Sequence, residues 1–282
     1  MIDDFDPSGL VDRETVLARC TDWLGPVEVL AERSWPHGES RILEVRTAAG
    51  RTILKWSLRD YTHRLERQAY QQFVPALGEL APRLLHFDDA LRLLVVTRLS
   101  GEPVGPADVG RPEVHRQAGA LFRRLHDSAS PRTDDGYAAR LLAELDGWVA
   151  RGGLAGPEIA AARALVAGVA DVSVPLVPTH YDSGPRNWLI DGDTVRLIDF
   201  GWVDWRPWCA DLVKLQRWPW LDRPDLQRAF LDGYGRTLDT AHDRMLPALH
   251  VLSAVFIITW AHEHGMSEFE QSARDALAAA IA

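Results

Sequence analysis

Two stretches decide how this chain is interpreted: THYDSGPRNWLI at residues 179–190 and VRLIDFGW at residues 195–202. The first contains Asp182 and Asn187 in an HxDxxxxN pattern, and the second contains a DFG triplet that begins twelve residues after the asparagine. Strand-like runs lie beside these polar groups, so the sequence predicts oxygen-bearing side chains in turns at strand ends. The alternative is a cluster of turn-forming residues without chemistry, because Asp, Asn, Ser and Gly all favour turns.

This combination resembles the catalytic centre of the aminoglycoside phosphotransferase and choline kinase group, relatives of the protein kinases. The resemblance implies transfer of a phosphoryl group from ATP or GTP with Mg²⁺ as cofactor. Asp182 would be the catalytic residue that orients the attacking hydroxyl and takes its proton. Asn187 and Asp199 would supply the hard oxygen ligands that Mg²⁺ prefers. The resemblance also implies structural roles for His180, in the core, and for Asp211, which would brace the catalytic loop.

Lysine and asparagine are rare in this chain. Only Lys55 and Lys214 are lysines among 31 basic residues, and Asn187 is the single asparagine. A retained lysine is informative because a point-charge ammonium and a guanidinium fork are not interchangeable. The resemblance implies that Lys55, in a predicted strand, pairs with nucleotide phosphates and is held by Glu66, or failing that by Asp60. The alternative for Lys55 is a solvated lysine on a strand, and the alternative for Glu66 is an ordinary surface residue of a helix.

The phosphate-binding loop and the hinge are weaker predictions. SWPHGES at 34–40 has one glycine, so the resemblance implies a reduced nucleotide loop, and an ordinary hairpin turn is the alternative. The candidate phosphate contacts in this loop are His37, Gly38, Glu39 and Ser40. Residues 97–100 would bind the nucleotide base through the backbone groups of Arg98 and either Leu99 or Ser100, on the strength of the resemblance alone.

Two residues of the predicted catalytic loop, residues 180–187, can each be interpreted in two ways. Tyr181 stands where the family usually has glycine, and its ring could pack under the loop or reach into the substrate cavity. Arg186 could balance phosphate charge or lie on the surface.

The acceptor side of the site is predicted from aromatic and acidic residues. Six of the eleven tryptophans fall between 188 and 220, which a large core would explain. The sharper interpretation is that Trp202 and Trp205 wall a substrate site and that Asp204 binds a cationic group. In the family the last helices form the acceptor pocket, so Glu263 and Glu268 are candidates too. A solvated acidic helix face explains these glutamates equally well.

The order of the elements predicts an α+β fold with two lobes. The sequence indicates a strand near 27–30, a hairpin at 41–56 whose first strand alternates, and a buried apolar strand at 91–99, while helical spacing appears at 11–24 and 60–77. Helical patterns continue at 111–126 and 138–150 and fill the chain after 211. The expected architecture is a bilobal protein-kinase-like fold, with a small antiparallel-sheet lobe (1–97), a hinge (98–106) and a larger, mainly helical lobe (107–282).

Composition narrows the possible partners. With 46% hydrophobic and 25% charged residues the chain is expected to be globular, and a net charge of −9 argues against nucleic-acid binding. That charge mildly favours a cationic small molecule. The acidic start MIDDFDPSGL is unlike a signal peptide, and we expect a cytoplasmic protein that does not enter membranes. Cys20 and Cys209 fit no metal pattern and are expected to be reduced core residues.

The expected function is therefore ATP- or GTP-dependent O-phosphorylation of a small, cationic hydroxyl compound by a monomer or homodimer. The resemblance is strongest to bacterial antibiotic phosphotransferases, with aminoglycosides or cationic peptides such as viomycin and capreomycin as acceptors. A metabolic kinase for choline, homoserine, a sugar or a nucleoside is the alternative. A second alternative is a module that binds a nucleotide without catalysing a reaction. A protein kinase fits poorly, because nine residues between Gly201 and Asp211 leave no room for an activation segment.

Overall fold

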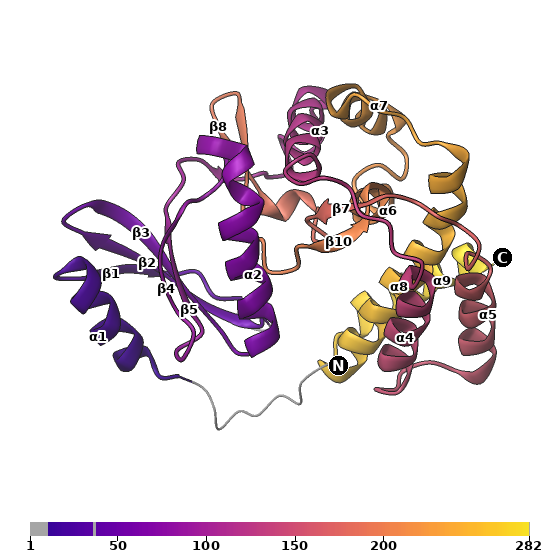
Figure 1. Cartoon of the computed structure of the whole chain (residues 1–282), viewed down its shortest axis with the longest axis horizontal. Helices are drawn as coiled ribbons and strands as arrows, with labels where there is room; N and C mark the ends of the chain where they lie inside the picture. Colours follow the sequence, from indigo (N-terminus) through magenta and orange to yellow (C-terminus); the bar gives the residue numbers. More distant parts are fainter. Residues whose placement is uncertain (1–10, 36–37, 282) are drawn as a thin grey trace.

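A five-stranded antiparallel sheet forms the N-terminal part of the chain in the computed structural model, which describes residues 11–35 and 38–281 (Figure 1). Its strand order is β1-β2-β3-β5-β4. The strands are β1 (Glu28–Glu32), β2 (Ser40–Thr47), β3 (Gly50–Ser57), β4 (Leu84–Asp88) and β5 (Leu93–Thr97). The predicted hairpin at 41–56 is present as β2 and β3, whereas β4 was not expected from the sequence.

The two faces of this sheet have different partners because side chains alternate along each strand. Leu43 and Leu54 are paired across β2 and β3 and belong to a buried cluster with α1 (Arg13–Leu24). The neighbouring pair, Ile42 and Lys55, therefore lies on the opposite face, where Lys55 meets α2 (Asp60–Gln72). The register of one hairpin thus directs the rare lysine away from the α1 side of the sheet.

The helix predicted over 60–77 is shorter in the structure. α2 ends at Gln72 and is followed by a 3₁₀ segment, η2 (Val74–Leu80). Pro75 lacks a backbone N–H, and Gly78 adopts a φ of 61°, so neither residue continues an α-helix.

A short link connects the sheet to the helical part of the chain. After β5, the two-residue strand β6 (Glu102–Pro103) pairs with β8 (Trp188–Asp191). β8 in turn pairs with β9 (Thr194–Leu197), and β7 (Leu176–Thr179) pairs with β10 (Asp204–Pro207). The link is therefore joined to the strand that follows residues 180–187, the predicted catalytic loop.

Helices make up most of the second lobe, which lies to the right in Figure 1. They are α3 (Pro112–His126), α4 (Tyr137–Val149), α5 (Gly156–Ala167), α6 (Val213–Arg217), α7 (Pro224–Tyr234), α8 (Thr240–Glu263) and α9 (Ser267–Ile281). α3 and α7 cross closely because each has a glycine at the contact. A Cβ at Gly119 would lie 2.1 Å from the Phe230 carbonyl oxygen, and one at Gly233 would lie 1.9 Å from that of Arg116. The expected mixed, bilobal fold class is confirmed.

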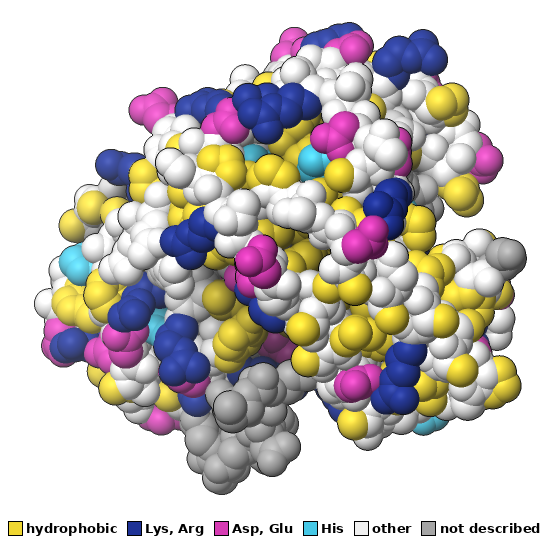
Figure 2. All heavy atoms as spheres, turned by 45° about the vertical axis from the view of Figure 1, so that its right-hand side comes forward, with side chains coloured by type: hydrophobic (Ala, Val, Ile, Leu, Met, Phe, Trp, Pro, Cys, Tyr) yellow, Lys and Arg dark blue, Asp and Glu magenta, His cyan; other side chains and the backbone are white. Residues whose placement is uncertain are grey.

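α8 is the central helix of this lobe. It is long and apolar enough to cross a membrane by length and composition, with a mean hydropathy of 1.6 over its most apolar window. However, 72% of that window is buried inside the protein, as in a core helix. On the face shown in Figure 2, acidic and basic side chains are interspersed without a large patch of one sign.

Candidate active site

The β8–β9 hairpin brings the two predicted metal ligands to the same end of a small sheet. Asn187 immediately precedes β8, Asp199 follows β9, and Trp188 is paired with Leu197 at that end. The backbone N–H of Ile198 donates to the carbonyl oxygen of Asn187 at 3.0 Å. Residues twelve positions apart are thus held together by the ladder of the hairpin.

Lys55 connects this end of the hairpin to the N-terminal sheet. Its Nζ donates to Asp199 Oδ1 at 2.7 Å and to Glu66 Oε1 at 2.9 Å. Glu66 on α2 therefore holds Lys55, whereas the alternative, Asp60, pairs with Arg64 at 3.0 Å. The side chains of Lys55 and Glu66 are almost fully buried, and that of Asp199 is 39% exposed.

Burial and charge act against each other in this triad. Burial disfavours the ammonium of Lys55, but Asp199 and Glu66 outweigh it and raise the pKa of Lys55 above its ordinary value. Burial likewise opposes ionisation of Asp199, yet Lys55 lowers the pKa of that carboxyl. Burial raises the pKa of Glu66 despite its contact with Lys55. The lysine stays cationic and the exposed carboxylate stays anionic at neutral pH.

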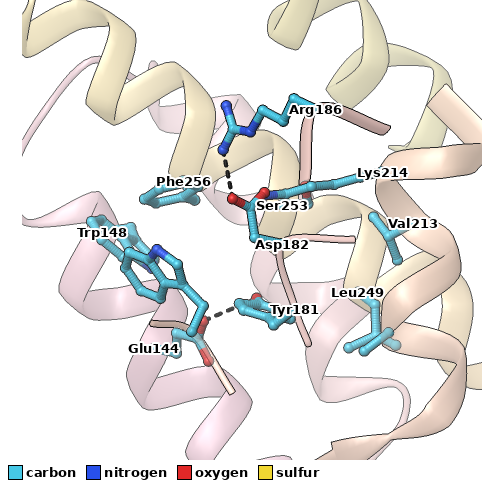
Figure 3. A pocket seen from close by; sticks show the side chains of 12 residues that line it. Glu144, Trp148, Tyr181, Asp182, Arg186, Val213, Lys214, Leu249, Ser253 and Phe256 are labelled. Carbon is cyan, nitrogen blue, oxygen red and sulfur yellow. Dashed lines mark hydrogen bonds and ion pairs between the residues drawn. The ribbon is translucent and has the colours of Figure 1, made fainter. Parts of the chain in front are cut away.

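Asp182 lies in a second buried ion cluster. Its Oδ1 accepts from Lys214 Nζ at 2.6 Å, and its Oδ2 accepts from Arg186 at 2.7 Å (Figure 3). Oδ2 also accepts from Asn187 Nδ2 at 2.9 Å. Burial alone would raise the pKa of Asp182, but Lys214 and Arg186 reverse that effect and hold it well below its usual range. Asp182 is therefore an ionised carboxylate that is 3% exposed.

Sequence reasoning missed Lys214 as a site residue. In the sequence it stands out only as the second lysine of the chain. It lies on α6, 32 residues after Asp182. The scarcity of lysine was the available signal, because the same argument that singles out Lys55 applies to it. Arg186, for which two interpretations were open, contacts Asp182 while its side chain remains 62% exposed.

Asp211 holds the first residues of the predicted catalytic loop, residues 180–187, by hydrogen bonds to their backbone. Its two carboxylate oxygens accept the backbone N–H groups of His180 at 2.8 Å and Tyr181 at 2.6 Å, and His126 donates to it at 2.9 Å. Tyr181 has a φ of 62°, a left-handed conformation that costs a non-glycine residue about 1 kcal/mol or more. This backbone geometry explains why glycine suits the position. His180 is fully buried and bonds the carbonyl oxygen of Ile198 at 3.0 Å.

The residues present fit a magnesium ion that is shared with a nucleotide. Asn187 uses its Nδ2 for both hydrogen bonds to Asp182, which leaves its amide oxygen as a ligand. Asp199 adds a partly exposed carboxylate. No group of three or more His, Cys, Asp or Glu residues suited to a metal occurs within 11–35 and 38–281. A site with one carboxylate, one amide oxygen and substrate phosphates is typical of Mg²⁺, which keeps few protein ligands.

The nucleotide-loop candidates lie at the start of β2. His37 lies outside the described residues. Gly38 donates its N–H to the Trp35 carbonyl at 3.0 Å, and Ser40 is the first residue of β2, paired with Ser57. The neighbouring Glu39 pairs with Arg59 at 3.1 Å.

The hinge candidates follow β5. The Arg98 guanidinium lies 3.6 Å from Glu44 Oε1 and donates to the carbonyl oxygen of Leu99. Ser100 Oγ donates to Asp191 at 2.5 Å. These contacts join the hinge to β2 and to the β8–β9 hairpin.

A cavity of about 80 Å³ lies beside Asp182, and one of the five acceptor candidates, Trp202, lines it. Trp205 instead packs edge-on against Phe73 and under Arg132, and Asp204 lies at the start of β10. Glu263 accepts from Arg151 at 2.6 Å, and Glu268 is exposed at the start of α9. The structure does not place these four residues among those that line the cavity.

The cavity is lined by several residues that sequence reasoning did not select. Glu144 and Trp148 come from α4, and Ser253 and Phe256 come from α8. The sequences of α4 and α8 look like those of helices that pack in a core, and both helices do contribute residues to the core. The sequence pattern therefore did not single out these four residues as cavity residues.

Known proteins share this architecture. A Thermobifida fusca protein provisionally named as a fructosamine-3-kinase is 20% identical, with 94% of this chain and 99% of that one covered and a TM-score of 0.71. A macrolide 2′-phosphotransferase from Brachybacterium faecium is 18% identical, with coverage of 94% and 98% and a TM-score of 0.58. A thermostable mutant of an aminoglycoside phosphotransferase, in a ternary complex with ADP and hygromycin B, is 14% identical, with coverage of 95% and 98% and a TM-score of 0.71. At these identities the likeness shows the fold alone.

Sequence comparison gives the family. No curated protein matches the chain. Residues 36–247 match the phosphotransferase enzyme family, a span that includes Lys55, Asp182, Asn187 and Asp199. The chain therefore belongs to the phosphotransferase enzyme family.

Proposed function

We propose that this protein transfers the γ-phosphoryl group of ATP or GTP to a hydroxyl group of a small molecule. The observation that carries the proposal is the meeting of two ion clusters, in which Asn187 contacts Asp182 and Asp199 contacts Lys55. Lys55 would pair with the nucleotide phosphates, and Asn187 and Asp199 would hold Mg²⁺, which neutralises phosphate charge when bound. The intact set of residues argues against a non-catalytic nucleotide-binding module.

Asp182 would act mainly by orientation. An oxygen–phosphorus bond forms between the acceptor hydroxyl and the γ-phosphorus, the bond from that phosphorus to the bridging oxygen breaks, and ADP or GDP leaves. The hydroxyl proton passes to Asp182 and then to solvent. A carboxylate with a lowered pKa is a weak base, but the transition state of phosphoryl transfer is loose and demands little proton removal before bond formation.

We further propose that the acceptor is an antibiotic, so that the reaction confers resistance. The shared fold with macrolide and aminoglycoside phosphotransferases supports this choice. A metabolic kinase would have the same catalytic residues and a different acceptor. A nucleotide-consumption assay with antibiotics, choline, homoserine, sugars and nucleosides separates the two, and expression in a sensitive host tests resistance directly.

The test of the catalytic assignment is Asp182→Asn, which keeps the shape of the side chain and removes its charge. Turnover should fall by about 10²- to 10⁴-fold, the usual range for loss of a positioned acid–base group, while nucleotide binding is retained. Undiminished turnover would remove Asp182 from this role.

A further inference from the structure

The cavity beside Asp182 has the position of an acceptor site, and its chemistry narrows the acceptor class. It lies between the catalytic loop and helices α4, α6 and α8, and Asp182, Arg186 and Lys214 reach it from one side (Figure 3). The inference that follows rests on the proposed phosphotransferase function, because it assumes that the acceptor hydroxyl approaches Asp182 through this cavity.

Among residues 11–35 and 38–281, every charged side chain that lines the cavity has a partner of opposite sign. Asp182 is paired with Lys214 and Arg186 at 2.6 and 2.7 Å. Glu144, the other lining carboxylate, accepts from Arg206 at 3.1 Å and from the hydroxyl of Tyr181 at 3.3 Å. These two carboxylates therefore face three cations, and neither of them is left to bind an ammonium group of a ligand.

Apart from the hydroxyl of Ser253, the remaining walls are aromatic and aliphatic. Phe256 packs edge-on against Trp148 at 4.7 Å and Trp202 at 6.0 Å between ring centroids, which gives a continuous aromatic wall. Ala210, Val213 and Leu249 add aliphatic surface. Such walls favour an apolar ligand face through burial of its surface.

Two of the rings already hold cations. The guanidinium of Arg206 lies 3.8 Å from the ring centroid of Tyr181, and that of Arg151 lies 4.7 Å from the ring centroid of Trp148. A ligand ammonium would meet these positive groups as well as Lys214 and Arg186. Like charges brought together in a partly buried site cost free energy, so a ligand with several amines is disfavoured.

We propose that this cavity takes the hydroxyl-bearing end of an electrically neutral compound with an apolar ring or alkyl face, and that it excludes polycations. This proposal replaces the cationic acceptor expected from the net charge of −9, because that charge is a property of the whole surface and not of the cavity. The cavity is partly open to solvent, and its volume of about 80 Å³ is smaller than most ligand sites, so only the hydroxyl-bearing end of the acceptor would enter it.

The test measures binding of matched hydroxyl compounds to the full chain in the presence of Mg²⁺ and the non-hydrolysable nucleotide AMP-PNP. The probes are a series of neutral alkyl and phenyl glucosides, choline with one fixed cation, and kanamycin with several amines. Tryptophan fluorescence reports binding, since Trp148 and Trp202 line the cavity. The best glucoside should bind at least about tenfold more tightly than choline or kanamycin, with little dependence on salt.

Two variants assign the binding to this cavity. Phe256→Ala should weaken glucoside binding by about tenfold, and Phe269→Ala, an exposed aromatic on α9 outside the cavity, should leave it unchanged. Arg206→Gln provides a second test, because it frees Glu144 and should strengthen kanamycin binding relative to the glucosides. Thermal unfolding of each variant checks that it is folded.

Kanamycin or choline binding as tightly as the best glucoside, or glucoside binding that is indifferent to Phe256→Ala, would overturn the proposal. Failure of all three probe classes to bind would overturn it too. Binding of Mg²⁺ and AMP-PNP in the same samples reports separately on the phosphotransferase function. Loss of nucleotide binding would therefore refute that function, whereas normal nucleotide binding with the wrong acceptor preference refutes only the inference drawn from this cavity.

Discussion

Each of the two ion clusters in the candidate active site pairs a lysine with a buried or partly buried carboxylate. They differ in where their residues lie in the sequence. In the Lys55–Glu66–Asp199 cluster, which lies on the side proposed for the nucleotide, Asp199 falls in the DFG motif and the other two residues lie in a predicted strand and helix. In the Asp182 cluster, Arg186 and Asn187 are local, but Lys214 comes from a separate helix and the neighbouring Glu144 from another. The proposed nucleotide side thus rests on residues that the motifs point to, whereas the proposed acceptor side also depends on residues from separate helices that the motifs do not include.

The largest effect should follow from Asp199→Ala, which removes a metal ligand and the partner of Lys55. Turnover should fall by about 10³-fold or more, because charge stabilisation of the transferred phosphoryl group is lost. Steady-state assays at saturating Mg²⁺ measure it, and circular dichroism controls for folding. Wild-type-like turnover would show that the nucleotide side is not built as described.

Lys55→Met should lower kcat/KM by about 10²-fold, mainly through weaker nucleotide use. It also leaves Glu66 buried without its cation, so the variant should lose some stability. Lys55→Met combined with Glu66→Gln removes that unpaired charge and should recover part of the lost stability without recovering activity. Calorimetric unfolding and kinetics on the same samples separate the two effects, and full recovery of activity would refute the role of Lys55.

Lys214→Met tests the acceptor side. Burial raises the pKa of Asp182 and Lys214 lowers it, so loss of the ammonium should raise this pKa and move the acid limb of the kcat/KM profile to higher pH. At neutral pH the expected loss is on the order of tenfold. Lys214→Arg keeps the charge and is the matched control.

The same substitution has a consequence for stability. Because the folded-state pKa of Asp182 is lowered, its ionisation stabilises the fold above the unfolded value of about 3.9, and this contribution is lost as pH falls through the folded-state pKa. Lys214→Met should reduce that contribution at neutral pH. An unchanged dependence of unfolding free energy on pH would contradict the assignment of Lys214 as the partner of Asp182.

The smallest effect is expected for Tyr181→Phe. Its hydroxyl makes one long hydrogen bond to Glu144, at 3.3 Å, and its ring remains under Arg206. A loss of at most about 1 kcal/mol in acceptor binding should follow, which is roughly fivefold in KM. A change of a hundredfold would mean that the hydroxyl itself contacts the acceptor.

The sequence predicts the Lys55–Glu66–Asp199 cluster better than it predicts the cavity beside Asp182. The β2–β3 hairpin carries alternation, and the strand-like runs at 187–190 and 195–200 flank the polar motif, so the positions of Lys55 and Asp199 were predictable from local pattern. Asp211 was predictable because the resemblance assigned it a bracing role, which its bonds to two backbone N–H groups match.

The acceptor cavity was not predictable in this way. Trp202 was selected because it follows the DFG triplet, but Glu263 was selected for its charge and proved to be paired with Arg151. Whether a carboxylate is free or neutralised depends on partners more than a hundred residues away. The short strand β10 was also missed, since Asp204 and Pro207 are poor strand formers and only pairing with β7 holds them.

The central claim is that Asn187 and Asp199 hold one divalent ion beside Lys55. Electron paramagnetic resonance of Mn²⁺ in the presence of AMP-PNP tests it most directly, because bound and free Mn²⁺ give distinct signals. We predict a protein-bound Mn²⁺–AMP-PNP signal for the wild type that is lost in both Asn187→Ala and Asp199→Ala. Undiminished binding in either variant would contradict the claim.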